Sequence, residues 1–422
     1  MVDENQIQNI QNLIESWRNE IVDTLQKIIQ IPAISPANDG KGELEKTELI
    51  EGILNKWGFH EIKRFDAQDE KAGGIIRPNI IAKIYGENKT GPTIWVVTHT
   101  DVVPVGDLSL WTTEPFKPVV KDGKIYGRGA EDNGQSLMAT MFAAFALLEL
   151  KIKPHYNIGL AIVADEETGS NYGIRYLLKQ NIFKPGDLIA VPDSGNPEGT
   201  QLEVSEKTIL WVKVTTKGKQ CHASLPELGI NAFKAATKFG YLSDIELYST
   251  FDYSDPMFDP PKSTFEMTKK EANVDNINTI PGSDIFNFDC RILPNYDPEE
   301  IWKKFEEIAK HVEDDTGAKI TLQRVQFEPA APPTAPDATV VRLLKDAVRQ
   351  VYNIEAQPRG IGGGTCGAFF RRAGFPTVVW SKIDDTCHAP NEYCVIDNLI
   401  NDSKVFSVFF ASKLKCQIID SG

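Results

Sequence analysis

The sequence predicts an α/β fold that is interrupted by a separate α+β domain. Apolar strand-like runs alternate with helical segments in the first half of the chain and again near its end, which is typical of a mixed, mostly parallel sheet covered by helices. Between these regions the order of elements becomes β-α-β-β-α-β, the order of a ferredoxin-like unit. The chain has 422 residues, which is long for one ordinary domain, so two domains are expected.

The first part of the chain begins with a helix and continues with alternating strands and helices. Apolar residues recur at spacings of three and four from Ile7 to Ile28, which predicts one long amphipathic helix that ends before Pro32. Apolar runs then predict strands at 79–85, 93–98, 156–164 and 188–192, and helices at 137–150 and 171–180.

The central region has its own succession of elements. Strands are expected at 207–216, 263–280, 284–293 and 319–326, and helices at 230–247 and 298–316. The proline-rich stretch Pro329–Pro336 follows as a semi-rigid linker. The helices 338–352 and 368–373 and the strand 376–380 then resume the earlier pattern. The expected boundaries are therefore 1–205 and 329–422 for the α/β domain and 206–328 for the inserted domain.

The composition of the chain limits the classes of partner and the cellular compartment that are expected. The chain carries 45 basic and 59 acidic residues, for a net charge of −14, and has no block of lysine and arginine, which disfavours nucleic acid and anionic membranes. Its longest apolar stretch is too short to cross a bilayer, and its polar N-terminus is not a signal peptide. Six cysteines without CxxC pairs indicate reduced thiols. A cytoplasmic protein with a small-molecule substrate is expected.

Side chains that can bind metal ions follow three of the expected strands. In open α/β sheets, ligands collect at the carboxyl ends of strands, so these side chains are expected to lie together. They are His99, the neighbouring pair Glu166 and Glu167, and Asp193. Of two adjacent glutamates, one can bind a metal ion while the other removes a proton from a metal-bound water.

Two further candidates complete a two-metal constellation. Asp132, in a glycine-rich turn, can give one carboxylate oxygen to each of two metal ions, and Glu131 is the alternative for this role. His388 lies in a polar loop after the strand 376–380. Asp101 can accept a hydrogen bond from the second ring nitrogen of His99. Oxygen and imidazole ligands without a thiolate predict two zinc ions, with cobalt or manganese as alternatives.

Two other motifs have competing interpretations. His222 lies between a strand and a helix of the inserted domain, where it can donate a hydrogen bond to a developing oxyanion. Gly362–Gly367 satisfies the GxGxxG pattern of dinucleotide-binding proteins, but the segment 353–359 before it does not read as a buried strand. A turn whose backbone amides bind a substrate carboxylate explains these glycines better.

Taken together, these motifs resemble the co-catalytic zinc amidohydrolases and peptidases. That family includes succinyl-diaminopimelate desuccinylase, acetylornithine deacetylase, aminoacylase, glutamate carboxypeptidase and carnosinase-type dipeptidases. The resemblance spans nearly the whole chain. It rests on His99–Pro104, Gly127–Asp132, Asp165–Ser170, Asp193–Gly195, Gly218–His222, Asn278–Pro281, Asp289–Arg291, Gly363–Thr365 and His388–Pro390.

The resemblance implies a role for each motif. It implies a zinc-peptidase-like catalytic domain in which Asp132 bridges two metal ions. His99 and Asp193 would complete one site, and Glu167 and His388 the other. Glu166 would be the general base, with Asp101 supporting His99.

The inserted domain would be the family's lid, which commonly also forms a homodimer. His222 would assist the tetrahedral intermediate. The carboxylate end of the substrate would be held by Asn278, Arg291, Gly363, Gly364 and Thr365, since a guanidinium forms two parallel hydrogen bonds to a carboxylate.

The implied reaction is hydrolysis of the amide bond of an N-acyl amino acid, most like that of succinyl-diaminopimelate desuccinylase or a related deacylase. Bacterial desuccinylases usually have glutamate where this chain has Asp193, and aspartate resembles the dipeptidase and aminoacylase branch. A dipeptidase or carboxypeptidase of the same family is therefore the alternative. A non-catalytic binding protein on the same fold is a remote one.

Overall fold

The computed structural model describes residues 4–413, and their contacts divide the chain into two compact units. Within the described residues, unit 1 comprises 4–204, Thr334–Pro358 and 365–413, and unit 2 comprises Ser205–Pro333 and Arg359–Gly364. The segment 359–364, which the sequence assigned to the α/β domain, groups with unit 2. It does so because Gly360 N donates to Met257 O (2.9 Å) and Lys207 N donates to Ile361 O (3.0 Å).

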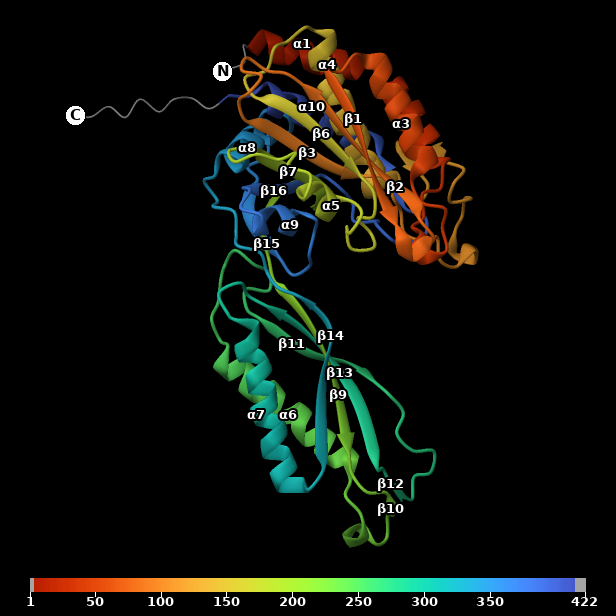
Figure 1. Cartoon of the computed structure of the whole chain (residues 1–422), viewed down its shortest axis with the longest axis vertical. Coiled ribbons are helices and arrows are strands. Elements are labelled where there is room, and N and C mark those ends of the chain that lie inside the picture. Colours follow the sequence, from red (N-terminus) through yellow and green to blue (C-terminus); the bar gives the residue numbers. More distant parts are fainter. Residues whose placement is uncertain (1–3, 414–422) are drawn as a thin grey trace, which may run out of the picture. The chain divides into compact units, whose positions relative to one another are not determined.

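Unit 1 is built on an eight-stranded sheet with the order β1-β2-β6-β3-β7-β16-β8-β15 (Figure 1). The strands are β1 (Glu61–Asp69), β2 (Ile75–Ile84), β3 (Thr93–His99), β6 (Asn157–Val163), β7 (Leu188–Gly195), β8 (Gln201–Glu206), β15 (Gln357–Ile361) and β16 (Thr377–Ser381). The neighbours β6, β3, β7 and β16 pair in parallel, while β1, β2 and β8 pair antiparallel. The sheet is mixed, as predicted, and its four central strands are parallel to one another.

Helices cover both faces of this sheet. On one face α4 (Ser136–Glu149) packs on β3 and β6, α8 (Thr339–Tyr352) packs on β7 and β16, and α10 (Ile396–Ala411) packs on both helices. On the other face α5 (Ile174–Leu178) and α9 (Gly367–Arg372) share a core with Trp95 and Val97 of β3. All seven residues of β3 are buried, which explains why its sequence is a continuous apolar run rather than an alternating one.

The N-terminal region differs from its prediction. The single helix expected from Ile7 to Ile28 is divided at Trp17 into α1 (Glu4–Ser16) and α2 (Arg18–Ile29). Trp17 leaves helical geometry with ψ of 5°, and its ring stacks on Phe145 of α4 with centroids 4.9 Å apart. The contact with α4 joins positions far apart in the chain, so helical periodicity does not register the break. The helix α3 (Leu44–Trp57) and the strand β1 were not predicted.

A small three-stranded sheet joins two segments that are distant in sequence. Its order is β17 (Tyr393–Val395), β5 (Lys124–Tyr126) and β4 (Val119–Lys121), with antiparallel pairing. Tyr393 lies opposite Tyr126. The loop that carries His388 is thereby attached beside the glycine-rich turn that carries Asp132.

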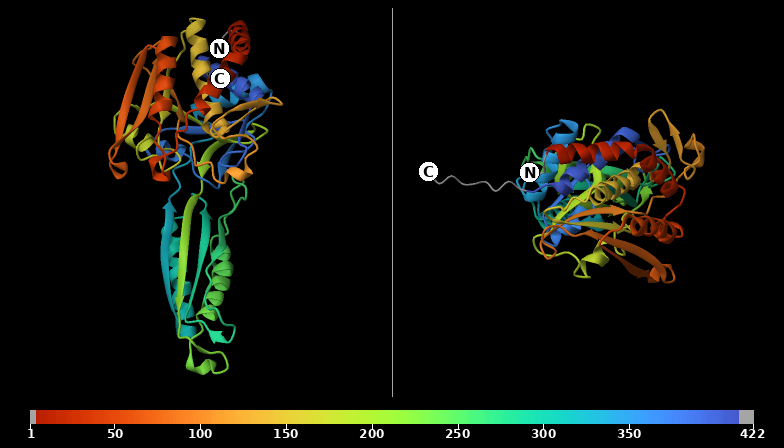
Figure 2. Two further views of the ribbon diagram at one scale, coloured as in Figure 1. Left: turned by 90° about the vertical axis from the view of Figure 1, so that its right-hand side faces the viewer. Right: turned by 90° about the horizontal axis from the view of Figure 1, so that it is seen from above.

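Unit 2 has the predicted β-α-β-β-α-β order. Its elements are β9 (Thr208–Lys217), α6 (Ala232–Thr250), β11 (Thr264–Lys270), β13 (Ser283–Ile292), α7 (Pro298–Thr316) and β14 (Lys319–Glu328). The four strands form an antiparallel sheet in the order β11-β13-β9-β14, and both helices lie against one face of it (Figure 2). Alternate residues of β13 are buried, as expected when one face of a sheet is covered.

One strand of unit 2 is shorter than predicted. The strand expected at 263–280 ends at Lys270, and only Thr279–Ile280 becomes a strand again, β12, which pairs with β10 (Cys221–His222). The residues between, Glu271–Asn278, are mostly polar, and Ile277 is fully exposed. Apart from one hydrogen bond, from Glu271 N to Ile285 O at 3.0 Å, they do not continue the pairing of β11 with β13.

Two further predictions concern membrane-spanning helices and the state of the cysteines. Among residues 4–413, no helix combines the length and the apolar character that a membrane span needs. The five cysteines in the same range are free thiols. Cys416 lies outside the described residues.

Candidate metal centre

The candidate site lies where three parallel strands of unit 1 end. His99 is the last residue of β3 and lies opposite Val163, the last residue of β6. Glu166 and Glu167 follow β6 after two residues, and Asp193 lies near the end of β7. Because β6, β3 and β7 are adjacent and parallel, their carboxyl ends meet at one edge of the sheet, where α/β proteins bind ligands.

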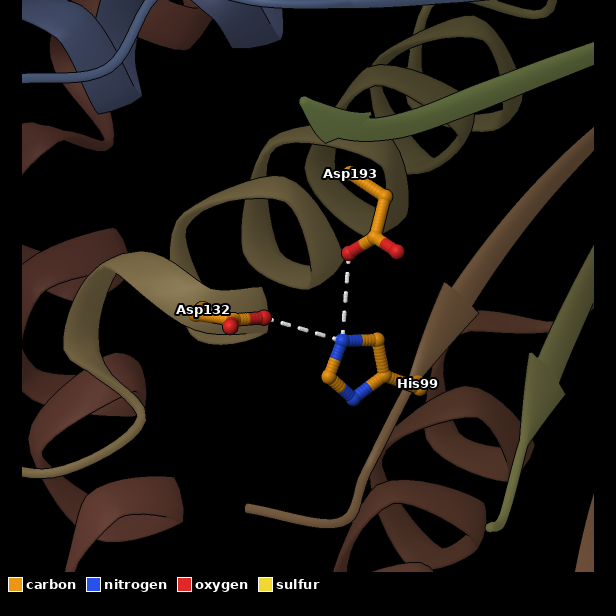
Figure 3. A group of neighbouring side chains, drawn as sticks. All are labelled: His99, Asp132 and Asp193. Atoms are coloured by element: carbon orange, nitrogen blue, oxygen red, sulfur yellow. Dashed lines mark hydrogen bonds and ion pairs between the residues drawn. The ribbon is translucent and has the colours of Figure 1, made fainter. Parts of the chain in front are cut away.

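The first cluster contains His99, Asp132 and Asp193. Nε2 of His99 lies 3.0 Å from Oδ1 of Asp132 and 3.1 Å from Oδ1 of Asp193 (Figure 3). Nδ1 of His99 lies 3.0 Å from the main-chain oxygen of Asp101 and 3.5 Å from its carboxylate. Asp101 thus holds the outer side of the ring chiefly through its carbonyl, and Nε2 faces the two carboxylates.

The second cluster contains Asp132, Glu167 and His388. Nε2 of His388 lies 3.2 Å from Oδ2 of Asp132 and 3.1 Å from Oε2 of Glu167. Asp132 therefore directs one carboxylate oxygen to each cluster. This division of its oxygens is the arrangement that a carboxylate bridge between two metal ions requires.

Asp101 also fixes the turn that carries the two glutamates. Its fully buried carboxylate accepts hydrogen bonds from the backbone N–H groups of Glu166 and Glu167, both at 3.1 Å. Asp165, which precedes them, has a φ of 64° and pairs with the buried guanidinium of Arg77 at 3.3 Å. The turn is thus anchored from two sides.

Glu166 borders the first cluster without belonging to it. A carboxylate oxygen of Glu166, one of Asp193 and the sulfur of Cys366 lie within 4.8 Å of one another. Burial raises the pKa of Glu166 well above its usual range, and the nearby charge of Asp193 raises it further. Cys366 was not singled out from the sequence, where it appears only as a residue after a glycine run.

The charges of the site are strongly coupled. Burial lowers the pKa of His99, but the charge of Asp193 and hydrogen bonds with Asp101, Asp132 and Asp193 bring it well above its usual range. Hydrogen bonds to Asp132 and Glu167 raise the pKa of His388 to about 10. Burial raises the pKa of Glu167 and of Asp193. A buried group of carboxylates needs compensating positive charge, which divalent cations supply.

The residues fit two divalent cations. Each cluster offers three ligand atoms within 4.8 Å of one another, and Asp132 belongs to both. Oε1 of Glu167 is buried and has no hydrogen-bond partner in the part of the chain that the structure describes. An unpartnered buried carboxylate oxygen is unfavourable, and a metal ion at the second cluster would satisfy it.

Comparison with known sequences agrees with this geometry. The family described as peptidase family M20/M25/M40 matches residues 95–411. The chain belongs to this family. The family resemblance read from the motifs is therefore confirmed, and the M20 chain is an enzyme that hydrolyses amide bonds with divalent metal ions.

Individual relatives of the M20 chain support the same assignment. An uncharacterized metallohydrolase of Methanococcus maripaludis is 41% identical over 416 residues, covering 93% of this chain and 99% of its own. A succinyl-diaminopimelate desuccinylase of Nautilia profundicola is 30% identical, covering 88% and 93%. Human carnosine dipeptidase 1 superposes with a TM-score of 0.70 at 19% identity, covering 96% and 98%. This last likeness concerns the fold.

The remaining expected site residues of the M20 chain lie in unit 2, apart from Thr365. His222 is exposed on β10, with Nδ1 2.7 Å from Oγ of Ser224. The carbonyl of Asn278 accepts the N–H of Ala223 at 2.8 Å, so Asn278 and His222 lie together. Arg291 of β13 pairs with Asp289 at 2.7 and 3.0 Å and donates to Gly362 O at 2.8 Å, next to Gly363 and Gly364.

These residues form two groups at opposite ends of the unit 2 sheet. Arg291 lies opposite Ile209 at the start of β9, whereas β10 follows the end of β9 at Lys217. The eight steps along the strand from Ile209 to Lys217 span roughly 26 Å at about 3.3 Å per residue. One small substrate therefore cannot touch both Arg291 and His222 of the same chain.

The glycine motif of the competing interpretation does not have the expected surroundings. The strand β15 precedes Gly362, but it is partly exposed and lies at the edge of the sheet. The helix that follows, α9, has six residues. A dinucleotide site needs a buried strand that leads through the glycine turn into a helix, so this interpretation is not supported.

Proposed function

We propose that this M20 enzyme removes the acyl group of N-acyl amino acids, as succinyl-diaminopimelate desuccinylase or a related deacylase does, with zinc as its metal and cobalt or manganese as alternatives. The observation that carries the proposal is the division of the Asp132 oxygens between two clusters, with Glu166 beside one of them. The match to a desuccinylase over most of both chains supports the choice of substrate class.

Glu166 has the position and environment of a general base. Two divalent ions at the clusters would polarise the substrate carbonyl and lower the pKa of a water molecule. Glu166 takes a proton from the attacking water and passes it to the leaving amine. The raised pKa of Glu166 helps it to hold that proton between the two steps.

Arg291 and the neighbouring glycine turn are proposed to bind the substrate's carboxylate. Asp289 and the carbonyl of Gly362 orient the guanidinium of Arg291, whose side chain keeps 29% of its surface exposed. The backbone N–H groups of Gly363, Gly364 and Thr365 follow directly along the chain. A fixed guanidinium beside backbone donors suits a carboxylate.

His222 and Asn278 are proposed to act in a homodimer. The separation of roughly 26 Å along β9 prevents them from reaching a substrate held by Arg291 of their own chain. A second copy would have to supply them. The proposal that His222 donates to the tetrahedral intermediate therefore depends on the proposal that the chain dimerises through unit 2.

A groove beside the edge strand β11 supports this dimer. Phe233 and Tyr241 of α6 and Met267 of β11 line it and are exposed by 47%, 62% and 51%. An edge strand with exposed apolar side chains is open to pairing with another chain. Its occupant is proposed to be the same surface of a second copy, related by a twofold axis.

Met267→Glu is expected to convert the dimer to a monomer, because two charged side chains would meet near the axis. Val325→Glu is the matched control, since Val325 is 52% exposed on the opposite edge strand β14. Light scattering coupled to gel filtration measures both masses. A wild-type monomer, or a Met267→Glu variant that remains dimeric, would contradict the proposal.

The alternative is a dipeptidase or carboxypeptidase, for which Asp193 in its Val-Pro-Asp-Ser-Gly motif is the specific argument. A panel of N-succinyl amino acids, N-acetyl amino acids and unblocked dipeptides, assayed with added zinc, cobalt or manganese, separates the two. We expect the highest kcat/KM for an N-acyl compound and loss of turnover after chelation. Turnover of dipeptides alone would favour the alternative, and no turnover with any metal would favour a binding protein.

A further inference from the structure

In unit 1, the turn that carries Asp132 and the loop that carries His388 each place a buried carboxylate against the backbone of the other. The carboxylate of Glu392, four residues after His388, accepts the backbone N–H groups of Gly129 at 2.9 Å, of Glu131 at 3.0 Å and of Asp132 at 3.0 Å. It also pairs with the guanidinium of Arg128 at 2.7 Å. Glu392 and Arg128 are fully buried or nearly so. The His388 loop thus holds the backbone that presents Asp132.

The opposite contact comes from Glu131, the residue before Asp132. Its buried carboxylate accepts the N–H of Asp384 at 2.7 Å, the N–H of Thr386 at 2.5 Å and the hydroxyl of Thr386 at 2.8 Å. Glu131 therefore holds the backbone that leads to His388. These contacts engage both of its oxygens, so Glu131 is not the bridging carboxylate that it could have been from the sequence.

His388 depends on its backbone for its position. Its side chain is 57% exposed, so packing does little to hold the ring. Its φ of 61° lies in the left-handed region, which a residue other than glycine adopts only when its surroundings enforce it. His99 and Asp193, by contrast, lie within strands β3 and β7 of the central sheet.

We propose that Glu131 and Glu392 form a reciprocal carboxylate clamp that positions His388 against Asp132 and so creates the second metal position. The proposal rests on the two-metal centre proposed above. The clamp residues are positioning residues, because their carboxylates are engaged by backbone N–H groups rather than directed at the metal ligands. The first position, formed with His99 and Asp193, depends on the sheet and does not need the contacts of Glu131.

Glu131→Gln tests the clamp without removing any ligand. One half of the new amide is a donor that faces the N–H of Asp384 or Thr386, so the His388 loop is loosened while Glu392 still holds Asp132. Loss of such an outer contact typically costs about 10–100-fold in metal affinity. Thr386→Val is a milder variant that removes one hydroxyl donor and is expected to act in the same direction with a smaller effect.

Asp187→Asn is the matched control. Asp187 is also a buried carboxylate that accepts two backbone N–H groups, those of Thr93 at 2.8 Å and Lys184 at 2.9 Å. Thr93 begins β3 and His99 ends it, so Asp187 lies roughly 20 Å from the candidate site at about 3.3 Å per residue. Its variant measures what the loss of a buried carboxylate does to the fold alone.

The experiment is a calorimetric titration of Zn²⁺ into each metal-free full-length protein, with thermal unfolding measured in parallel. Wild type is expected to bind two ions, one more tightly than the other, and Asp187→Asn is expected to bind both with the wild-type affinities. Glu131→Gln is expected to keep the tighter event and weaken the other by about 10–100-fold. His388→Ala should lose the weaker binding event. The double variant His388→Ala/Glu131→Gln should bind the remaining ion with the same affinity as His388→Ala alone.

The proposal is overturned if Glu131→Gln binds both ions as wild type does, if it weakens both events equally, or if wild type binds fewer than two ions. These readouts do not involve substrate. A wild-type protein that binds two ions but hydrolyses none of the substrate panel would refute the proposed function and leave the clamp standing.

Discussion

Glu166→Gln is expected to lower turnover of the preferred substrate by about 10²–10⁴-fold or more while both metal ions remain bound. The change removes the group that accepts the proton of the attacking water, but it keeps the shape of the side chain. Glu166 shares no cluster with a histidine, so metal binding should be nearly unaffected. Initial rates under saturating substrate and metal content after dialysis measure the two effects.

Glu167→Gln is the internal control for this result, because the same change is made one residue further along the same turn. This variant should weaken the binding of the metal ion at the cluster with His388, since Glu167 Oε2 lies 3.1 Å from His388 Nε2. Near-normal turnover of Glu166→Gln would show that the base is misassigned. Loss of a metal ion from Glu166→Gln would show that Glu166 is a ligand.

Asp132→Asn is expected to lower the affinity for both metal ions by at least about 100-fold and to reduce activity to background. The reason is that Asp132 is the residue shared by both clusters. An amide keeps one acceptor oxygen but replaces the other with a donor, so it cannot bridge two cations. The binding of Zn²⁺ at defined free concentrations measures the loss at each position.

The comparison that decides this prediction uses variants that should lose a single ion. His388→Ala and Glu167→Gln remove ligands of the second cluster only, so each should retain one tightly bound ion. If Asp132→Asn also retained one ion with wild-type affinity, the bridging role would be wrong. Two ions with unchanged affinities would mean that Asp132 is not a ligand.

The sequence predicted those parts of the fold that depend on local pattern. The buried strands β3, β6 and β7 are continuous apolar runs, and α7 has the predicted bounds, with Pro298 at its first position and Asp297 accepting the N–H of Glu299. The helix break at Trp17 and the end of β11 at Lys270 were not predicted. Both follow from packing or pairing with segments that are distant in the chain.

The same distinction applies to the candidate site. The expected ligands could be named because each follows a strand or a glycine-rich turn, and the structure brings all five together in two clusters. The contacts that hold them could not be named. The clamp joins Glu131 to Thr386 across 255 positions and Glu392 to Gly129 across 263, and no spacing rule connects such residues.

The sequence alone also could not assign roles that depend on the directions of side chains and on the distances between them. Glu131 and Asp132 are adjacent acids in one turn, and only the directions of their side chains show that Glu131 faces the 384–386 backbone while Asp132 faces both histidines. Likewise, Arg291 and His222 both belong to motifs of the inserted domain. The length of β9 separates them in space, and this distance cannot be read from the motifs.

The most direct test of the two-metal centre is a crystal structure of the zinc-loaded protein with diffraction recorded at the zinc absorption edge. Two anomalous peaks about 3.5–4 Å apart are expected, both in contact with Asp132, one flanked by His99 and Asp193 and the other by Glu167 and His388. A single peak, or two peaks that do not share Asp132, would contradict the account.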